Sequence, residues 1–344
     1  MTTNLRPGVY SSYDITSFYT ANPGAKHAGV VAKGDGGEPD KLYTFNSYAE
    51  VCEIFSAGSS PMRGISKILF ESGVPRVYAV KTDGDYKNAL ELLEETDNIG
   101  AVVCDAVSPS DLEELRRSVE RSSAIRRERV AFAGANTVQE AITAANGVNS
   151  ERVVICGTAV SPRGLTASGA VYCAAAVAGF VLATADAAHN FSGEILRTVE
   201  KPERAAESEI QRLLANGVTA VESSGGAVRI IRALTTRTMS GDVGDRAMSG
   251  LNTILIIDSV ISGIRTALET RLRGGRISGG NSFESIASQV MVELAGLRDN
   301  GMIETFAPPR VSRHPADPAT CVVELSFHVA HVLNQIHIMA HVQV

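Results

Sequence analysis

The sequence predicts an α/β protein: a parallel-sheet α/β domain plus a mixed α+β C-terminal domain, with extended N- and C-terminal β-strand arms. Three observations lead to this prediction. Between residues 27 and 190, short apolar runs alternate with amphipathic segments, which is typical of a parallel sheet covered by helices. After residue 190 the alternation gives way to mixed strands and two long helical segments. Both chain ends carry strand patterns. The expected units are residues 1–22, 23–190, 191–332 and 333–344.

The first expected element is an arm over residues 9–20, which is rich in aromatic and β-branched residues. Pro7-Gly8 precedes it and Pro23-Gly24 follows it, so turns bound it on both sides. A strand at a chain end needs a sheet to pair with, because an open edge invites pairing with another chain. We expect its side chains to bind a neighbouring copy of the chain, and those predicted to do so are Val9, Tyr10, Tyr13, Ile15 and Phe18.

The α/β domain is expected to contain five strands that are buried on both faces, because each is an almost continuous apolar run. These strands are expected at residues 27–33, 76–80, 99–104, 129–133 and 152–156. Helices are expected at residues 47–57, 61–72, 86–96, 110–121 and 138–145. Ser108-Pro109 and the capping-box pattern of Thr137 and Glu140 mark two helix starts. The apolar stretch 170–183 is shorter than the roughly 20 residues needed to span a bilayer, so it predicts a buried helix.

The C-terminal domain is expected to begin with a helix over residues 202–215, which Asn216-Gly217 ends. Strands follow at residues 218–222 and 227–235, joined by a hairpin turn at the Gly225-Gly226 pair. Two long helices are expected at residues 251–272 and 283–297. The second helix is expected to bury Phe283, Ile286, Ala287, Val290, Leu294 and Leu297, which recur at helical spacing.

Two strands are expected to close the chain, at residues 321–331 and 336–344. The last nine residues alternate apolar and polar side chains, which is the period of a strand. The apolar face of this C-terminal arm consists of Ile336, Ile338, Ala340, Val342 and Val344. Strand-like arms at both ends predict a protein that links to copies of itself.

Composition excludes several functions. The chain has a net charge of −6 and no basic stripe, which argues against nucleic acid as a partner. Its first residues lack the apolar core of a signal peptide, so synthesis in the cytoplasm without membrane insertion is expected. The five cysteines are an odd number and none forms a C-x-x-C pair, so no disulfide framework is expected.

A search for catalytic motifs finds little. The sequence has no Gly-Lys pair for a phosphate-binding P-loop, Pro39 interrupts the glycine pattern of a dinucleotide site, and no serine stands in G-x-S-x-G. The best metal candidates are His328, His331, His337 and His341. Only two of them share a strand face and no carboxylate or cysteine joins them at ligand spacing, so neither a metal nor another cofactor is expected.

Three further features have both structural and functional interpretations. Cys104 and Cys156 each end an apolar strand, where an enzyme can hold a nucleophile, although a buried thiol is the simpler interpretation. The run of alternating arginines and glutamates between residues 113 and 129 indicates a solvated helix face or a salt-sensitive contact. Asp258, within an apolar helix, must face water or a partner.

In order along the chain, several segments resemble the tail sheath proteins of contractile phages and phage-tail-like particles. They are Arg6-Pro-Gly-Val-Tyr10, residues 214–222, residues 227–238, the two long helices and the closing strand pair. Each motif is weak alone, but their order and spacing together are specific, and the resemblance covers the whole chain. The chain departs from the family in having no tryptophan.

The resemblance implies a structural protein without enzymatic activity. Family members form hexameric rings stacked helically around a tail tube, between a baseplate and a tail terminator, and contract to drive the tube through a cell envelope. Terminal arms of neighbours would complete a small sheet whose receiving residues are Val323, Leu325, Phe327 and Val329. Residues 23–190 would form the outer domain, and residues 191–332 the core facing the tube, with residues 274–300 in contact with it. Assembly would place the protein, made in a bacterial host, in a virion tail or an extracellular tail-like particle.

Two other functions stay open from the sequence. One is a cytoplasmic α/β enzyme of the acyl-transfer, thiolase-like kind, with a cysteine nucleophile and a histidine base. It draws on the parallel-sheet pattern and on the cysteines at strand ends, and a fold alone does not fix a function. The other is a closed-ring shell or scaffold protein, which would share the arms but give particles of fixed size.

Overall fold

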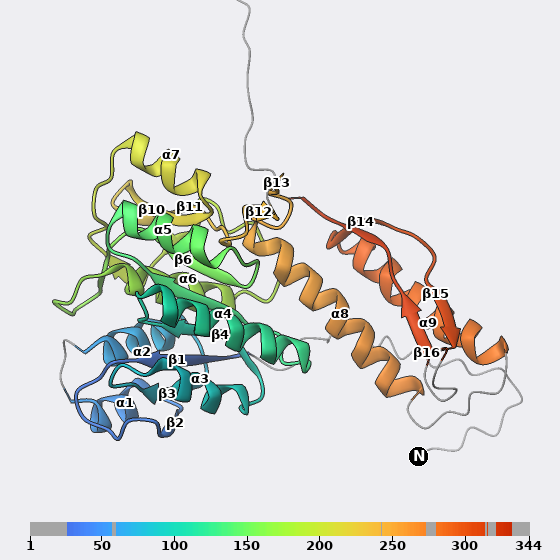
Figure 1. Ribbon diagram of the computed structural model, residues 1–344, viewed down its shortest axis with the longest axis horizontal. Coiled ribbons are helices and arrows are strands. Elements are labelled where there is room, and N and C mark those ends of the chain that lie inside the picture. Colours follow the sequence, from blue (N-terminus) through green and yellow to red (C-terminus); the bar gives the residue numbers. More distant parts are fainter. Residues whose placement is uncertain are drawn as a thin grey trace, which may run out of the picture.

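The computed structural model describes residues 26–56, 60–241, 243–272, 280–313, 315 and 321–331. The described chain forms an α/β body, to the left in Figure 1, and an extension of two long helices with a strand hairpin, to the right. The predicted arms at residues 9–20 and 336–344, with the side chains assigned to them, lie outside the described residues.

One mixed sheet runs through the body in the order β2-β3-β1-β4-β5-β6-β10-β11-β8. The strands from β3 to β10 in this order are parallel, whereas β2 at one edge and β11 and β8 at the other are antiparallel to their neighbours. The strands are β1 (His27–Ala32), β2 (Leu42–Phe45), β3 (Val77–Lys81), β4 (Ile99–Cys104), β5 (Val130–Gly134), β6 (Val153–Cys156), β8 (Ile195–Leu196), β10 (Val218–Ser224) and β11 (Ala227–Arg232). The predicted α/β class with a mainly parallel sheet is confirmed.

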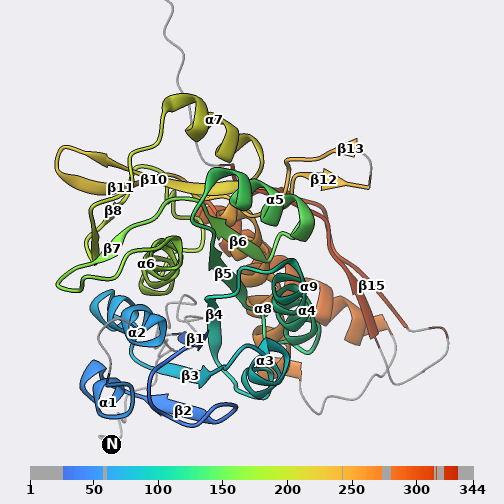
Figure 2. The ribbon, with the colours of Figure 1, turned by 60° about the vertical axis from the view of Figure 1, so that its left-hand side comes forward.

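Helices cover both faces of this sheet (Figure 2). One face carries α1 (Tyr48–Ile54), α2 (Pro61–Glu71) and α6 (Ala170–Ala183). The other carries α3 (Tyr86–Glu94), α4 (Pro109–Ala124), α5 (Val138–Val148) and α7 (Glu207–Ala215). The five predicted strands are buried as expected because both faces are covered, and α6 is the predicted buried helix.

Local sequence sets most helix starts. The Thr137 side chain accepts a hydrogen bond from the Glu140 N–H at 3.2 Å while Glu140 reaches back to the Thr137 N–H, which confirms the predicted capping box. The predicted start of α7 at residue 202 is wrong. The Glu203 N–H donates to the Ala159 carbonyl, so this segment is tied to the body and the helix begins only at Glu207.

The sheet continues across residue 190, where the sequence suggested a domain boundary. Strand β10 pairs in parallel with β6, with Val218 opposite Ile155, and β11 and β8 extend the same sheet. The predicted hairpin turn joins β10 to β11, with Gly225 and Gly226 at φ of 60° and 78°. Two small ladders lie outside this sheet, β7 (Ser161–Pro162) with β9 (Val199–Glu200) and β12 (Met239–Ser240) with β13 (Val243–Gly244).

Helix α8 (Leu251–Leu272) links the body to the extension, where it packs along α9 (Gly280–Asp299). Its first turn enters the body core through Leu251 and Ile254, and its later turns join the extension core through Ile256, Val260 and Ile264. Within the described residues, α8 is long and apolar enough to cross a membrane by length and composition alone. A helix that fills two protein cores passes the same test.

Candidate assembly site

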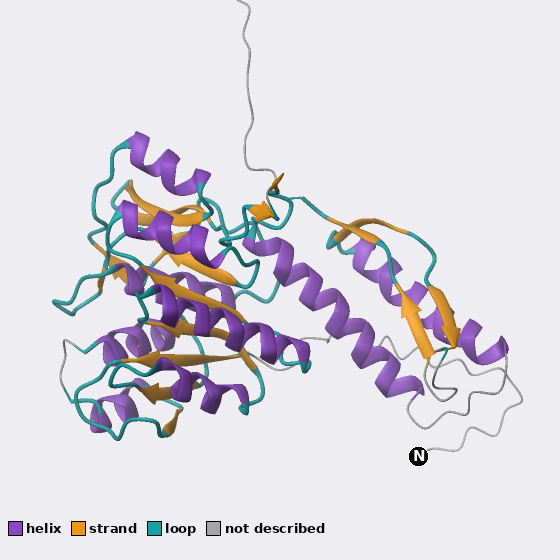
Figure 3. Ribbon diagram, in the orientation of Figure 1, coloured by secondary structure: helices purple, strands orange, loops and turns teal. Residues whose placement is uncertain are grey.

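The candidate assembly site is a strand hairpin at the C-terminal end of the described chain (Figure 3). It consists of β14 (Ile303–Phe306), β15 (Arg310–Arg313), β16 (Cys321–Glu324) and β17 (Phe327–Val329). Strand β14 pairs with β17 and β15 with β16, both antiparallel. The Ala307 N–H donates to the Ser326 carbonyl at 2.9 Å, so the two ladders form one long ribbon.

The predicted single strand over residues 321–331 is therefore two strands. Leu325 and Ser326 interrupt it, and the facing strand carries Pro308-Pro309 at the same level of the ribbon. Proline has no N–H to donate, so the ladder cannot run through this point. The ribbon is kinked here rather than continuous.

All four predicted receiving residues lie on one face of the ribbon. Val323, Leu325, Phe327 and Val329 are half-buried, and exposed residues alternate with them in the sequence. They pack against a core of apolar residues from α8, α9 and β14, namely Ile256, Val260, Ile264, Val290, Leu294, Leu297 and Ile303. This apolar face of the ribbon is thus held in place by two helices. Of the six residues expected to be buried on α9, Val290, Leu294 and Leu297 are buried, whereas Phe283, Ile286 and Ala287 are half-buried.

The outer sides of the ribbon present unpaired strand edges within the described part of the chain. Among the described residues, each of its strands pairs with one neighbour only. An unpaired strand side presents a row of N–H and C=O groups that another strand can join. A third strand on either side would also extend the half-buried apolar face, so backbone pairing and side-chain burial act together.

A row of ion pairs attaches α8 to the body. The Asp258 carboxylate accepts two hydrogen bonds from the Arg152 guanidinium, both at 2.8 Å. Further along the same helix, Arg265 pairs with Glu128 at 2.6 Å and Glu269 with Arg126 at 3.3 Å. Positions 258, 265 and 269 are seven and four residues apart, so they lie along one side of the helix. The partner that the sequence required for Asp258 is Arg152, within the same chain.

These pairs differ in burial and therefore in strength. The side chains of Arg152 and Asp258 are 15% and 8% exposed, whereas Arg126 and Glu269 are mostly solvated. Burial alone would lower the pKa of Arg152, but the hydrogen bonds that it donates to Asp258 and the charge of that carboxylate outweigh burial and raise the pKa above its usual value. Arg152 is therefore charged in the fold, and Asp258 is its counter-ion. Apart from its position at the start of a strand, this arginine had no feature in the sequence that indicated the pairing.

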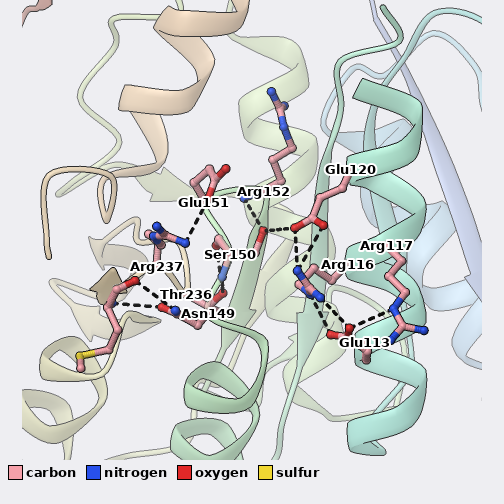
Figure 4. A network of polar contacts seen from close by, with 11 residues as sticks. Glu113, Arg116, Arg117, Glu120, Asn149, Ser150, Glu151, Arg152, Thr236 and Arg237 are labelled. Carbon is pink, nitrogen blue, oxygen red and sulfur yellow. Dashed lines mark hydrogen bonds and ion pairs between the residues drawn. The ribbon is translucent and has the colours of Figure 1, made fainter. Parts of the chain in front are cut away.

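The corner between α5 and β6 holds the segment that carried much of the family resemblance (Figure 4). The Asn149 carboxamide oxygen accepts from the Thr238 and Met239 N–H groups at 3.0 and 3.1 Å. The buried Thr236 hydroxyl accepts from the Ser150 N–H at 2.9 Å and donates to the Ser150 carbonyl at 3.0 Å. Asn149 has φ of 41°, a backbone conformation that asparagine tolerates well. The corner thus fixes where the chain leaves the sheet toward α8.

The charged run of residues 113–129 is only partly a solvated helix face. On α4, Arg116 and Arg117 form the expected pairs with glutamates three and four residues away (Figure 4). Arg129 contradicts the prediction, because its side chain is 1% exposed and donates to the carbonyls of Leu93 and Thr96 at 2.8 and 3.0 Å. Burial and repulsion from Arg127 lower the pKa of Arg129 to about 10.

The two strand-end cysteines are buried thiols. Cys104 and Cys156 are fully buried, and all five cysteines are free. Burial, together with the nearby Asp105 charge, raises the pKa of Cys104, and a hydrogen bond to Cys173 together with burial raises that of Cys156. A nucleophilic cysteine needs an accessible thiolate at neutral pH. At Cys104 and Cys156 the thiol is inaccessible and its raised pKa keeps it protonated at neutral pH.

At the carboxyl edge of the parallel strands, where α/β enzymes bind ligands, a hollow of about 270 Å³ lies next to Lys33 and Asp83. The helix that faces it, α2, has used its first N–H groups. The Met62 N–H donates to the Lys33 carbonyl and the Arg63 N–H to the Ser60 hydroxyl. Asp105, at the end of β4, accepts from the Lys33 N–H and the Tyr86 hydroxyl at 2.9 and 2.8 Å. Contacts within the protein thus occupy this edge.

The histidine candidates do not meet as a metal site in the described chain. Its residues contain no group of three or more His, Cys, Asp or Glu side chains suited to a metal ion. His328 instead lies on the exposed face of the ribbon and hydrogen-bonds the Thr305 hydroxyl at 3.0 Å. His337 and His341 lie outside the described residues.

Several solved structures have a fold similar to that of this chain. The helical sheath of the anti-feeding prophage in its contracted state superposes with a TM-score of 0.71 at 13% sequence identity, over 99% of both chains. The chain has the tail-sheath fold. A crystal structure of a sheath tail protein from Desulfitobacterium hafniense matches this fold with a TM-score of 0.67 at 10% identity, over 94% of this chain and 100% of that one. A sheath tail protein from Listeria innocua matches with 0.69 at 11%, over 90% and 92%.

The resemblance inferred from the sequence is thus confirmed at the level of the tail-sheath fold. No protein-family model matches the sequence, and no curated protein matches it. The near-complete coverage of the matched chains means that the tail-sheath fold accounts for both the body and the helix-hairpin extension.

Proposed function

We propose that this chain is the structural subunit of a contractile tail sheath and has no enzymatic activity. One observation carries the proposal: among the described residues, the ribbon of β14–β17 has two unpaired strand sides and an apolar face held by α8 and α9, in a chain with the tail-sheath fold. A protein that adds strands from its neighbours needs such a platform. One of the matched structures comes from a baseplate of the anti-feeding prophage, which supports the baseplate as a partner.

Assembly follows from exchange of the terminal arms. Residues 9–20 of one neighbour and residues 336–344 of another would pair with the free sides of the ribbon. Their apolar side chains would then lie beside Val323, Leu325, Phe327 and Val329. Each contact joins unlike surfaces and does not close on itself, so it propagates into an open helical lattice of stacked hexameric rings. A tail terminator would end the lattice opposite the baseplate.

The extension is proposed to face the tail tube and residues 23–190 to face outward. Helix α9 supports this orientation, because it leaves Met291 and Val292 37% and 57% exposed on the side away from its core. A shallow hollow of about 480 Å³ lies over the same helix, beside Glu284, Gln289 and Val292. Exposed apolar side chains on an otherwise polar helix face are typical of a protein contact.

The proposed mechanism is mechanical. The sheath assembles in an extended, metastable form and contracts when contacts between bodies become more extensive, while the arms keep neighbours connected. Contraction drives the tube through the target envelope. Nucleic acid and membrane insertion have no part in this mechanism. Synthesis takes place in the host cytoplasm, and the product is a virion tail or an extracellular tail-like particle.

Electron microscopy of the purified chain in negative stain tests polymerisation directly. We expect striated tubes from the full chain. Removal of residues 333–344 is expected to leave a folded, soluble body that no longer polymerises, since α8, α9 and the ribbon retain their core. Unchanged tubes from the truncated chain would contradict the assignment of the C-terminal arm. Discrete particles of fixed size from the full chain would instead favour a closed ring.

The alternative function, a thiolase-like enzyme, is disfavoured by the burial and raised pKa of the two strand-end cysteines. Substitution of Cys104 or Cys156 by alanine separates the two functions. The sheath proposal expects both variants to assemble like the parent chain, because each thiol acts only as a small buried group. If the parent chain has acyl-transfer activity and either variant loses it, the enzyme hypothesis would be favoured over the sheath proposal.

A further inference from the structure

A hollow lies between α6, α8 and the amino ends of the parallel strands. Its volume is about 450 Å³, within the range of sites that hold a drug-sized group. Its apolar wall is formed by side chains that the body leaves half-buried, Val181 and Leu182 at the end of α6 and Leu255 on α8, with buried Phe191 behind them. Its rim is polar and includes Asp186, Ser259 and Ser262.

The position of Lys26 links this cleft to the N-terminal segment. Lys26 is the first described residue, directly before β1, and it lines the cleft. Its side chain passes closely over Gly100, where a Cβ atom would lie 2.6 Å from the Lys26 Cδ and 2.9 Å from a Leu182 methyl. A glycine is therefore required for the chain to pass at this point. The described chain therefore begins at the cleft, and 25 residues precede this point in the sequence.

The chemistry of that segment matches the cleft. Tyr19 stands seven residues before Lys26, a separation that spans at most about 25 Å of extended chain. Pro23-Gly24 lies between them, and this pair favours a turn that brings the chain back on itself. A tyrosine buries a large apolar ring and requires a hydrogen-bond partner for its hydroxyl, which the serines and Asp186 of the rim supply.

We propose that the segment directly before Lys26 docks in this cleft of its own subunit, with the Tyr19 ring against Val181, Leu182 and Leu255. The docked segment anchors the root of the N-terminal arm. It leaves residues 9–18, which include every side chain assigned to the neighbour, as the part that reaches a neighbour, and it fixes the place from which they depart. The proposal does not depend on sheath function, because docking takes place within one chain and is independent of polymerisation.

The absence of tryptophan from the chain allows a test without background fluorescence. The probe is Tyr19→Trp in the full chain, with Tyr10→Trp as the matched control further from Lys26. We expect Tyr19→Trp to emit at shorter wavelength than Tyr10→Trp and to resist acrylamide quenching severalfold better. Both properties should be independent of protein concentration over the dilute range. Equal emission and quenching for the two variants would overturn the proposal.

A second substitution tests whether the cleft is the docking site, because a large charged side chain there would block it. Ser259→Arg, added to the Tyr19→Trp chain, is expected to shift the emission back to longer wavelength and to remove the protection from quenching. Ala185→Arg, on the exposed loop at the cleft mouth, serves the same purpose if circular dichroism shows that Ser259→Arg unfolds α8. Protection that survives in the folded cleft variant contradicts the proposed site. Protection that appears only as concentration rises would assign the cleft to a neighbour's segment and overturn docking within one chain.

Discussion

At the scale of single residues, Asp258 forms the most buried of the ion pairs that attach α8 to the body. It is the one acidic residue in the first half of an apolar helix, and its carboxylate is 8% exposed beside Arg152. Two charges buried together cost desolvation energy, which their mutual hydrogen bonds offset. Removal of one partner leaves the other charged and unpaired in the protein interior. The intact pair therefore adds little net stability, but the loss of either partner is strongly destabilising.

Asp258→Asn is therefore expected to lower the free energy of unfolding by roughly 3 kcal/mol, because the Arg152 charge loses its buried counter-ion. Denaturation in urea, followed by circular dichroism, measures the change. Asp83→Asn is the matched control, since Asp83 pairs with Lys81 at a site where its own side chain is 67% exposed. That variant is expected to change the stability by less than about 1 kcal/mol. Equal losses in the two variants would contradict the special position of Asp258.

Glu128 adds a pH dependence to the same attachment. Burial would raise its pKa, but the hydrogen bond from Arg265 and the backbone outweigh this and hold the pKa below its usual value. A lowered pKa in the folded state stabilises the fold above the unfolded pKa of about 4.3, and the contribution disappears as the pH falls through the folded value. The stability advantage of the parent chain over Glu128→Gln should therefore be full at pH 6 and decline as the pH falls below the unfolded pKa and through the lowered folded pKa. Unfolding measured across this range checks it, and an advantage that grows on acidification would contradict it.

At the scale of elements, the local sequence pattern was sufficient to predict the strands that are buried on both faces. Strands β1 and β3 to β6 were found within a residue or two, because each is a short apolar run buried on both faces. Strands β2 and β8 were not predicted, since edge strands of two to four residues carry little periodicity. The break at Ser326 depends on prolines in the facing strand, and the pairing of Arg152 with Asp258 joins positions 106 residues apart. Neither is encoded in a single window of sequence.

The two sides of α9 allow a prediction for one helix with its own control. Leu294 is fully buried under the ribbon, whereas Val292 is 57% exposed. Leu294→Ala is expected to cost about 3 kcal/mol of stability, through lost burial and the cavity that remains. Val292→Ala should stay within about 0.5 kcal/mol of the parent chain and should weaken binding of the tail tube protein. Thermal unfolding and a tube co-sedimentation assay measure the two effects, and a reversed order of stabilities would contradict the packing of α9.

At the scale of the whole molecule, the sequence placed a boundary at residue 190 where the structure has a continuous sheet. The division into residues 23–190 and 191–332 followed a change of local pattern, and that change is real, because the sheet turns from parallel to antiparallel pairing beyond β10. Pairing between β6 and β10 brings together segments about 60 residues apart, which no local pattern reports. The arms, the tube-facing side and the outer position of the body remain predictions.

The body is expected to fold without either arm. A chain lacking residues 1–18, which keeps Tyr19, should retain the unfolding free energy of the full-length monomer to within about 1 kcal/mol, because both sheet faces and the α8–α9 core are complete in the residues that remain. It should stay monomeric in sedimentation velocity at concentrations where the full chain forms tubes. Tubes from this variant would show that the N-terminal arm is dispensable for assembly.

Helix α8 has one end in the core of the body and the other under the ribbon. With 22 residues it is about 33 Å long. Any pull that a neighbour exerts on the ribbon must pass along this rod, since within the described chain the ribbon rests on α8 and α9. Three ion pairs hold this rod to the body, the buried one to Arg152 near its first turns and those of Arg265 and Glu269 further along. The pull of an arm on the ribbon, as proposed above, would therefore load all three pairs.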